Sequence, residues 1–288
     1  MDSSIDWSIL PPGTEAGTFD APSGRLATAT WGPRDGVPVL LLPGITGSKE
    51  DFSLIGPALG SSGYRAVAVD LAGQFASGDA GPDESGHWSL DLHTEDALAI
   101  LRKIGPAHLV GYSYSGVVAS RVAVTHPELL RSVVYLSAPP LSGDSFRKMR
   151  VVGALSRFVT PKMGSAILRG AIRNGINWLP RKRKEFIKYR LKFTQKQSVD
   201  DTMETMMAVP DYEEALATSP LPRLVTAGSG DLWSLKTHRA FADRVGAEFK
   251  SYRSGHSPAE SKPKEYARDL IDFFHKVDEG KLASETPL

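Results

Sequence analysis

A serine at a sharp corner between a buried strand and a helix is the feature that most constrains this chain. Residues 107–112 form a short apolar run typical of a strand, and residues 114–125 place valines and alanines four apart, as in a helix. Ser113 therefore falls where a strand turns into a helix with almost no loop. Such a strained turn needs small neighbours, and Gly111 and Ser115 provide them. We expect the hydroxyl to project into solvent at the carboxyl end of a sheet; the simpler alternative is a serine that caps a helix.

Apolar runs and helical patterns alternate along most of the 288 residues. This rhythm predicts an α/β fold with a mostly parallel central sheet flanked by helices. An irregular lead-in is expected over residues 1–20 and an edge strand over 25–31. The remaining predicted strands are 37–42, 65–70, 107–112, 132–137, 222–228 and 247–253, and the predicted helices are 49–59, 90–104, 114–125, 235–245 and 258–276.

The rhythm changes after residue 140, where short amphipathic helices replace strands. We predict an inserted all-helical cap over residues 141–219, between core segments 1–140 and 220–288. The insertion carries 15 Lys and Arg against 8 Asp and Glu, whereas the rest of the chain carries 19 against 25. A charge run such as Arg181–Lys184 is usually a solvated face. An anionic substrate, a carrier-linked acyl group and an acidic membrane surface stay open as alternatives.

Composition narrows the classes of function. The chain has no cysteine, which removes disulfides and thiolate chemistry, and its net charge of +1 argues against a nucleic-acid partner. No apolar run approaches the roughly 20 residues of a membrane span. The acidic start lacks the apolar region of a signal peptide, so a cytoplasmic location is expected. No histidine pair has the spacing of metal ligands, and neither a metal nor another cofactor is expected.

A serine hydroxyl becomes a nucleophile only when a base accepts its proton and a third group orients that base. His256 follows a predicted strand within a loop of small residues, where a side chain can reach across the sheet edge. Asp231 lies in a Gly-rich loop after another strand, although it could instead cap the following helix. Asp70 precedes the serine and is expected to shape a loop. The other histidines are expected in structural or exposed positions: His108 before a strand, His126 at a helix end, His275 late in a helix, and His87, His93 and His238 in loops or on helix surfaces.

An oxyanion formed by attack on a carbonyl needs amide donors already in place. The amide of Tyr114 begins the helix after the serine, and the loop 43–47 can present the amide of Ile45. Gly44 allows the backbone of that loop to approach a substrate closely.

Five segments together resemble the α/β-hydrolase fold family, serine-nucleophile branch with a helical cap: 41–48, 70–74, 111–116, 227–231 and 255–258. The resemblance implies Ser113 as nucleophile, His256 as base, Asp231 as its orienting acid, and the amides of Ile45 and Tyr114 as the oxyanion hole. Three departures stand out. Pro43 replaces a common histidine, Ser115 replaces the usual glycine, and Gln74-Phe75 replaces a common His-Gly.

The expected activity is hydrolysis of a carboxylic ester or thioester through an acyl-enzyme, on a small-molecule acyl substrate that could be anionic or carrier-linked. A serine at 113 disfavours the epoxide hydrolase and haloalkane dehalogenase branches, whose chemistry needs a carboxylate. Hydrolysis of a carbon–carbon bond, acyl transfer, elimination and a non-catalytic, receptor-like role stay open. Gly44, Trp178, Phe186 and Met207 are candidates for the substrate pocket, although aromatic residues at helical spacing more often form a cap's own core.

Overall fold

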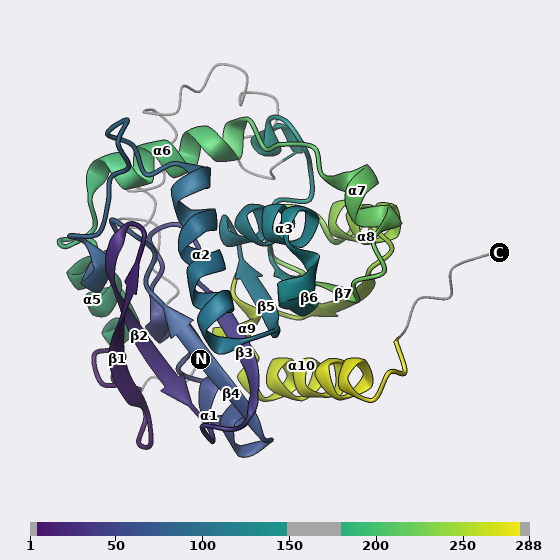
Figure 1. Ribbon diagram of the computed structural model, residues 1–288, viewed down its shortest axis with the longest axis horizontal. Helices are drawn as coiled ribbons and strands as arrows, with labels where there is room; N and C mark the ends of the chain where they lie inside the picture. The colour runs from purple at the N-terminus through teal and green to yellow at the C-terminus, as the bar shows by residue number, and fades with distance from the viewer. Residues whose placement is uncertain (1–4, 149–179, 283–288) are drawn as a thin grey trace.

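A computed structural model of the chain describes residues 5–148 and 180–282 (Figure 1). Its strands are β1 (Glu15–Ala21), β2 (Gly24–Trp31), β3 (Val37–Leu42), β4 (Tyr64–Val69), β5 (Ala107–Tyr112), β6 (Leu130–Leu136), β7 (Arg223–Gly228) and β8 (Glu248–Tyr252). Its α-helices are α1 (Gly56–Ser61), α2 (Leu90–Ile104), α3 (Ser115–Thr125), α5 (Arg181–Arg190), α6 (Lys196–Met207), α7 (Glu213–Thr218), α8 (Leu235–Arg244), α9 (Pro258–Ser261) and α10 (Pro263–Asp278). Short 3₁₀ turns are η1 (Lys49–Phe52), η2 (Phe75–Ser77), η3 (Pro127–Leu129) and η4 (Ser145–Lys148).

The strands form one eight-stranded sheet in the order β1-β2-β4-β3-β5-β6-β7-β8. β1 and β2 pair antiparallel, as do β2 and β4, and all other neighbours are parallel. The carboxyl ends of the parallel strands therefore meet at one edge, where side chains from several strands can converge. The predicted α/β fold with a mostly parallel, helix-flanked sheet is confirmed.

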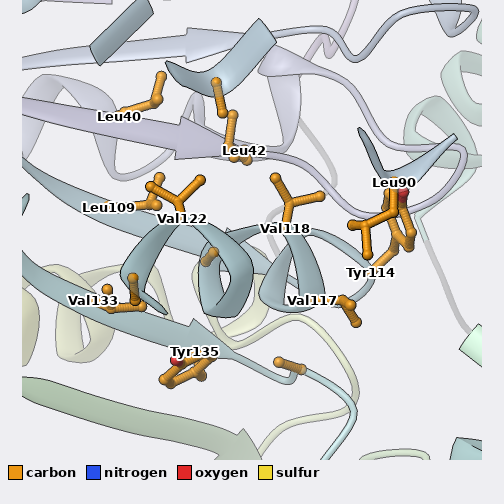
Figure 2. Close-up of a cluster of buried hydrophobic side chains, with 14 of the residues drawn as sticks. Leu40, Leu42, Leu90, Leu109, Tyr114, Val117, Val118, Val122, Val133 and Tyr135 are labelled. Carbon is orange, nitrogen blue, oxygen red and sulfur yellow. The ribbon is translucent and has the colours of Figure 1, made fainter. Parts of the chain in front are cut away.

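Two hydrophobic cores cover the two faces of the sheet. Side chains alternate between them along each central strand: Leu40 and Leu42 of β3 point into one core, and Val39 and Leu41 point into the other. Figure 2 shows the first core, where residues of β3, β5 and β6 pack against α3. The second core packs against α1 and α10. Burial on both faces explains the unbroken apolar runs of these strands in the sequence.

The amino-terminal part of the predicted fold is wrong in two places. Residues 1–20 are not an irregular lead-in, because 15–21 form β1 and pair in register with β2. β2 consequently lies inside the sheet rather than at its edge. Most of β1 is exposed, so it lacks the apolar pattern that identifies a strand in a sequence.

Two predicted helices are interrupted. The segment 49–59 divides into η1 and α1, and α1 begins with Pro57 in its first turn; Gly56 packs so closely on Trp31 that a Cβ there would lie 2.4 Å from the indole. The closing helix divides into α9 and α10, because Pro263 cannot continue the hydrogen-bond ladder and Lys262 has a non-helical backbone.

Helices α5, α6 and α7 lie between β6 and β7 in the chain, as expected for an inserted helical cap. Within the described part of this insertion, the β-pairing is an isolated bridge between Gly143 and Val209. The exact limits 141 and 219 stay predictions. None of the helices described combines the length and the apolar character needed to cross a membrane.

Asp96 of α2 gives the fold a test by pH. Its Oδ1 accepts a hydrogen bond from the Ser23 amide, its Oδ2 has no hydrogen-bond partner among the described residues, and burial raises its pKa to about 6. A carboxyl whose pKa is higher in the folded state than the ordinary value near 3.9 contributes stability below pH 4 and loses it as pH rises through 6. We expect Asp96→Asn to gain roughly 1–2 kcal/mol relative to wild type between pH 4 and pH 8.

Urea unfolding at the two pH values measures this gain. Glu95→Gln, on the exposed side of the same helix, is the control and should show no comparable change. A constant difference between Asp96→Asn and wild type across this range would contradict the prediction.

Candidate active site

Ser113 occupies a strained corner between β5 and α3. Its φ is 52°, in the left-handed region that residues with a Cβ avoid. The Ser113 amide donates to the Leu136 carbonyl at 2.9 Å, which ties the corner to the next strand. Gly111 is required here, because a Cβ at that position would lie 2.4 Å from the Ser115 carbonyl oxygen. Ser113 is only 4% exposed, so the expectation of a hydroxyl in open solvent is wrong.

Backbone strain is concentrated at the same edge of the sheet. In addition to Ser113, three non-glycine residues of the described part of the chain have positive φ: Thr46 at 59°, Phe75 at 44° and Ser137 at 48°. They follow β3, β4 and β6 respectively. Each such residue costs roughly 1–3 kcal/mol, and such residues cluster at functional sites. This edge is therefore the candidate site.

The structure brings Ser113, His256 and Asp231 together. His256 Nε2 lies 3.0 Å from Ser113 Oγ, and His256 Nδ1 lies 2.5 Å from Asp231 Oδ1. The same carboxylate oxygen accepts the Leu232 amide at 2.5 Å. These contacts form a continuous path from a hydroxyl through an imidazole to a carboxylate.

The electrostatics of this path favour an ionised carboxylate. Burial alone would raise the pKa of Asp231, but attraction to His256 and contacts from His256 and His238 outweigh burial and hold this pKa below its ordinary value. The imidazole ring of His256 packs beside Tyr112 and Trp233, with centroid distances of 5.4 and 6.3 Å. The carboxylate can therefore fix both the tautomer and the orientation of His256.

The loop after β3 lies directly beside Ser113. A Cβ at Gly44 would lie 3.0 Å from Ser113 Cβ, a tight contact that glycine avoids. Ser115 Oγ donates to the Pro43 carbonyl at 2.5 Å and ties the loop to the corner. Among the described residues, neither the Ile45 nor the Tyr114 amide donates to a backbone carbonyl outside a helix or strand. Their role as an oxyanion hole stays a prediction.

Two histidines that the sequence placed in loops or on helix surfaces are buried at this edge. His93 is 1% exposed, and its Nδ1 lies 2.9 Å from the Tyr114 hydroxyl; burial lowers its pKa to about 4, so it is neutral. His238 is fully buried beside Asp231. The sequence pattern can place these histidines on helices. It does not show whether they are buried, because burial depends on which loops pack against each helix. His108 is also fully buried, near the amino end of β5.

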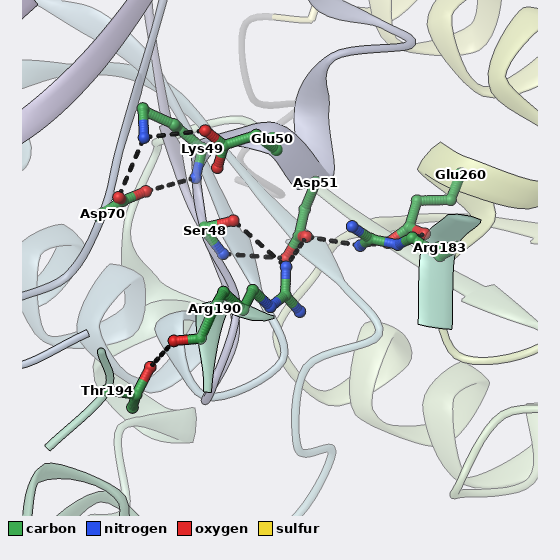
Figure 3. Close-up of polar contacts among 9 residues, drawn as sticks. All are labelled: Ser48, Lys49, Glu50, Asp51, Asp70, Arg183, Arg190, Thr194 and Glu260. Carbon is green, nitrogen blue, oxygen red and sulfur yellow. Dashed lines mark hydrogen bonds and ion pairs between the residues drawn. The ribbon is translucent and has the colours of Figure 1, made fainter. Parts of the chain in front are cut away.

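A cluster of buried charges joins α5 to the loop beside Ser113 (Figure 3). Asp51 Oδ1 accepts hydrogen bonds from Arg183 at 2.7 Å and Arg190 at 2.5 Å, while its Oδ2 accepts the Ser48 amide at 3.2 Å. Arg183 also forms a two-pronged ion pair with Glu260 at 2.7 and 2.9 Å. Arg183 is 1% exposed, so the run 181–184 is not entirely a solvated face.

Asp70 fixes the neighbouring loops, as expected of a loop-shaping residue. It is fully buried at the end of β4 and accepts hydrogen bonds from the amide and Nζ of Lys49, at 2.7 and 3.1 Å, and from the Ala76 amide at 3.2 Å. Lys49 Nζ also contacts Glu50 at 2.9 Å. Asp70 thus joins the loop after β3 to the loop after β4.

The predicted pocket residues are placed differently from one another. Gly44 lies against Ser113, whereas Phe186 packs on Phe75 and beneath Arg183 and Arg190. Met207 is partly buried against the first hydrophobic core. Trp178 lies outside the described residues, and the pocket roles stay predictions. Within residues 5–148 and 180–282, no group of three His, Asp or Glu side chains is arranged to hold a metal ion.

Comparisons with known proteins show which sequences and structures this chain is similar to. The model of the alpha/beta hydrolase family matches residues 39–269. Bifunctional epoxide hydrolase 2 of Rattus norvegicus is 34% identical over 85 residues, which span 29% of this chain and 15% of that protein. Pimeloyl-[acyl-carrier protein] methyl ester esterase of Aeromonas hydrophila is 42% identical over 84 residues, or 29% of this chain and 31% of that protein. The chain thus matches less than a third of the length of either relative.

A solved structure extends the likeness in fold to nearly the whole chain. Epoxide hydrolase VrEH1 from Vigna radiata has a TM-score of 0.73 at 19% identity, covering 92% of this chain and 98% of that one.

The buried charge cluster predicts unequal roles for two arginines of α5. Arg183→Met leaves Glu260 buried without its cation, and we expect a loss of about 3 kcal/mol in the free energy of unfolding. Arg181, which contacts Glu185 at 3.1 Å on the exposed face, is the matched control; Arg181→Met should lose less than about 0.5 kcal/mol. Urea unfolding followed by tryptophan fluorescence measures both, and equal losses would contradict the prediction.

Proposed function

Since the chain belongs to the alpha/beta hydrolase family, we propose that it is a serine hydrolase that cleaves a carboxylic ester or thioester through an acyl-enzyme. The observation that carries this proposal is the path from Ser113 Oγ to His256 Nε2 at 3.0 Å and from His256 Nδ1 to Asp231 Oδ1 at 2.5 Å. One of the similar proteins is named as an ester hydrolase, which agrees with this reaction class.

In the first half-reaction, His256 Nε2 accepts the hydroxyl proton as Ser113 Oγ attacks the carbonyl carbon of the substrate. Asp231 stabilises the imidazolium that forms and holds the ring in place. The amides of Ile45 and Tyr114 receive the carbonyl oxygen as it gains negative charge. His256 then returns the proton to the leaving alcohol or thiol, and the acyl group stays on Ser113.

In the second half-reaction, water attacks the acyl carbonyl. His256 accepts a proton from this water, the same two amides receive the oxyanion, and the proton returns to Ser113 Oγ as the acid is released. No step in this sequence needs a metal or an organic cofactor. A hydroxyl rather than a carboxylate at position 113 favours acyl chemistry over the opening of an epoxide, although several of the similar proteins are named epoxide hydrolases.

Replacement of Ser113 tests the nucleophile. We expect Ser113→Ala to lower kcat for an activated short-chain ester by about 10⁴-fold or more, because no other group can carry the acyl intermediate. A fluorophosphonate probe should label wild type but not the variant, as read by mass spectrometry of the intact protein.

Ser120→Ala is the matched control, because Ser120 is a buried serine of α3 whose hydroxyl contacts Tyr135. It should keep both turnover and labelling. Unchanged turnover in Ser113→Ala, or no labelling and no ester turnover in wild type, would overturn the proposal; the second result would favour a receptor-like role.

The contact between Ser115 and Pro43 predicts a role in holding the oxyanion loop. Ser115→Ala keeps the small volume that the corner needs but removes the hydrogen bond to the Pro43 carbonyl. A net loss of about 1 kcal/mol in the placement of the loop corresponds to a decrease of about 5- to 10-fold in kcat, with little change in KM. Steady-state kinetics measures this, and a kcat equal to that of Ser120→Ala would contradict it.

A further inference from the structure

Asp231 is faced by two imidazoles, of which the proposed mechanism uses only one. Its Oδ1 is occupied by His256 and by the Leu232 amide. Its Oδ2 is buried and has no aligned hydrogen bond among the described residues, but His238 Nε2 lies 3.0 Å from it, close enough for a small rotation of either group to align the two. Asp231 and His238 are 1% and 0% exposed, so bulk water does not compete for either group.

The surroundings fix His238 in this place. It lies in the first turn of α8, where Ser234 accepts the Thr237 amide with its side chain and the His238 amide with its carbonyl. Its imidazole packs edge-on against Trp233 at an interplanar angle of 87°. Trp233 is itself fully buried and donates from Nε1 to the Ser145 carbonyl at 2.7 Å. These contacts hold the His238 ring in place beside the Asp231 carboxylate.

We propose that His238 is a positioning residue that, as a neutral imidazole, donates its Nε2–H to Asp231 Oδ2 and thereby aims Oδ1 at His256. This inference rests on the proposed function for its effect on turnover. Neither ring nitrogen of His238 has another hydrogen-bond partner among the described residues, and a neutral imidazole has one N–H to give. With that proton on Nε2, the ring can donate to Asp231, the buried anion that it faces.

The second hydrogen bond has two consequences. It prevents rotation of the carboxylate, because each oxygen is then held by its own donor. It also draws negative charge toward Oδ2, so Oδ1 holds the proton on His256 less tightly than an unshared carboxylate would. Without the donor, His256 should take up its inactivating proton at higher pH.

The other charged groups around Ser113, His256 and Asp231 offer few other causes for a change in the pH at which His256 is protonated. Among the described residues, the ionisable side chains with the largest effect on the pKa of Asp231 are His256 and His238. Tyr112 of β5 faces the His256 ring, but burial raises the pKa of its phenol well above the ordinary value, so it stays neutral. Glu260 of α9 acts on Tyr112, but its charge is paired with Arg183.

The test compares His238→Phe, which fills the space without a donor, with His238→Gln, which restores an amide donor. For His238→Phe we expect kcat for an activated ester to fall about 10-fold with KM nearly unchanged. The pH at which kcat/KM is half lost on the acid side should rise by about 0.5 to 1. His238→Gln should return both values most of the way to wild type.

His108→Phe is the matched control for loss of a buried imidazole. His108 stacks on Phe274 at 4.0 Å and contacts Ser132, away from Asp231. This variant should lose stability without moving the acid limb. An unmoved acid limb in His238→Phe, or a limb that moves equally in His108→Phe, would overturn the inference.

A measurement on the wild-type protein needs neither folded variants nor a substrate. ¹⁵N NMR of labelled histidines should show His238 as the neutral Nε2–H tautomer from pH 5 to pH 8. An Nδ1–H tautomer, or titration of His238 in this range, would overturn the inference. Turnover retained by Ser113→Ala together with an Nε2–H tautomer would instead refute the proposed function alone.

Discussion

The left-handed backbone of Ser113 is the constraint on which the rest of the site depends. A residue with a Cβ does not hold a φ of 52° unless its surroundings leave no alternative. Three features hold Ser113 in this conformation: the hydrogen bond from its amide to the Leu136 carbonyl, the space left by Gly111, and the first turn of α3. The side chain is consequently aimed at His256 rather than along the strand. The packing of β5 and α3 in the first core, shown in Figure 2, supports this corner from one face of the sheet.

Two departures from the family pattern compensate for each other across that corner. Ser115 replaces a glycine and Pro43 replaces a histidine, and the hydroxyl of the first donates to the carbonyl of the second at 2.5 Å. A glycine at 115 could not form this bond, and Pro43 limits the backbone freedom of the loop that receives it. The pair holds the loop containing Gly44 and Ile45 against the nucleophile corner. The sequence marks both positions as unusual, but only the fold shows that they are partners.

The predictable parts of the site are those with a local signature. Ser113, Asp231 and His256 each follow a strand within small residues, and that pattern is visible in the chain. The role of His238 has no such signature, because its burial depends on α8 meeting the loop of Asp231 seven residues earlier. Arg183 was expected in solvent for the same reason: a basic run does not show that one of its members meets two buried carboxylates. β1 was missed because its exposed side chains follow no apolar period.

The buried charges in Figure 3 connect the loop beside Ser113 to the inserted helix α5. Burial would raise the pKa of Asp51, but Arg190 and Arg183 outweigh that effect and keep it below its ordinary value, so the carboxylate is ionised. The same carboxylate accepts the Ser48 amide at the end of the loop beside Ser113. If α5 moved away, Asp51 would lose both of the cations that pair with it. The docking of α5 and the order of the loop beside Ser113 therefore depend on the same carboxylate, and the inserted helix contributes to the candidate site through charge.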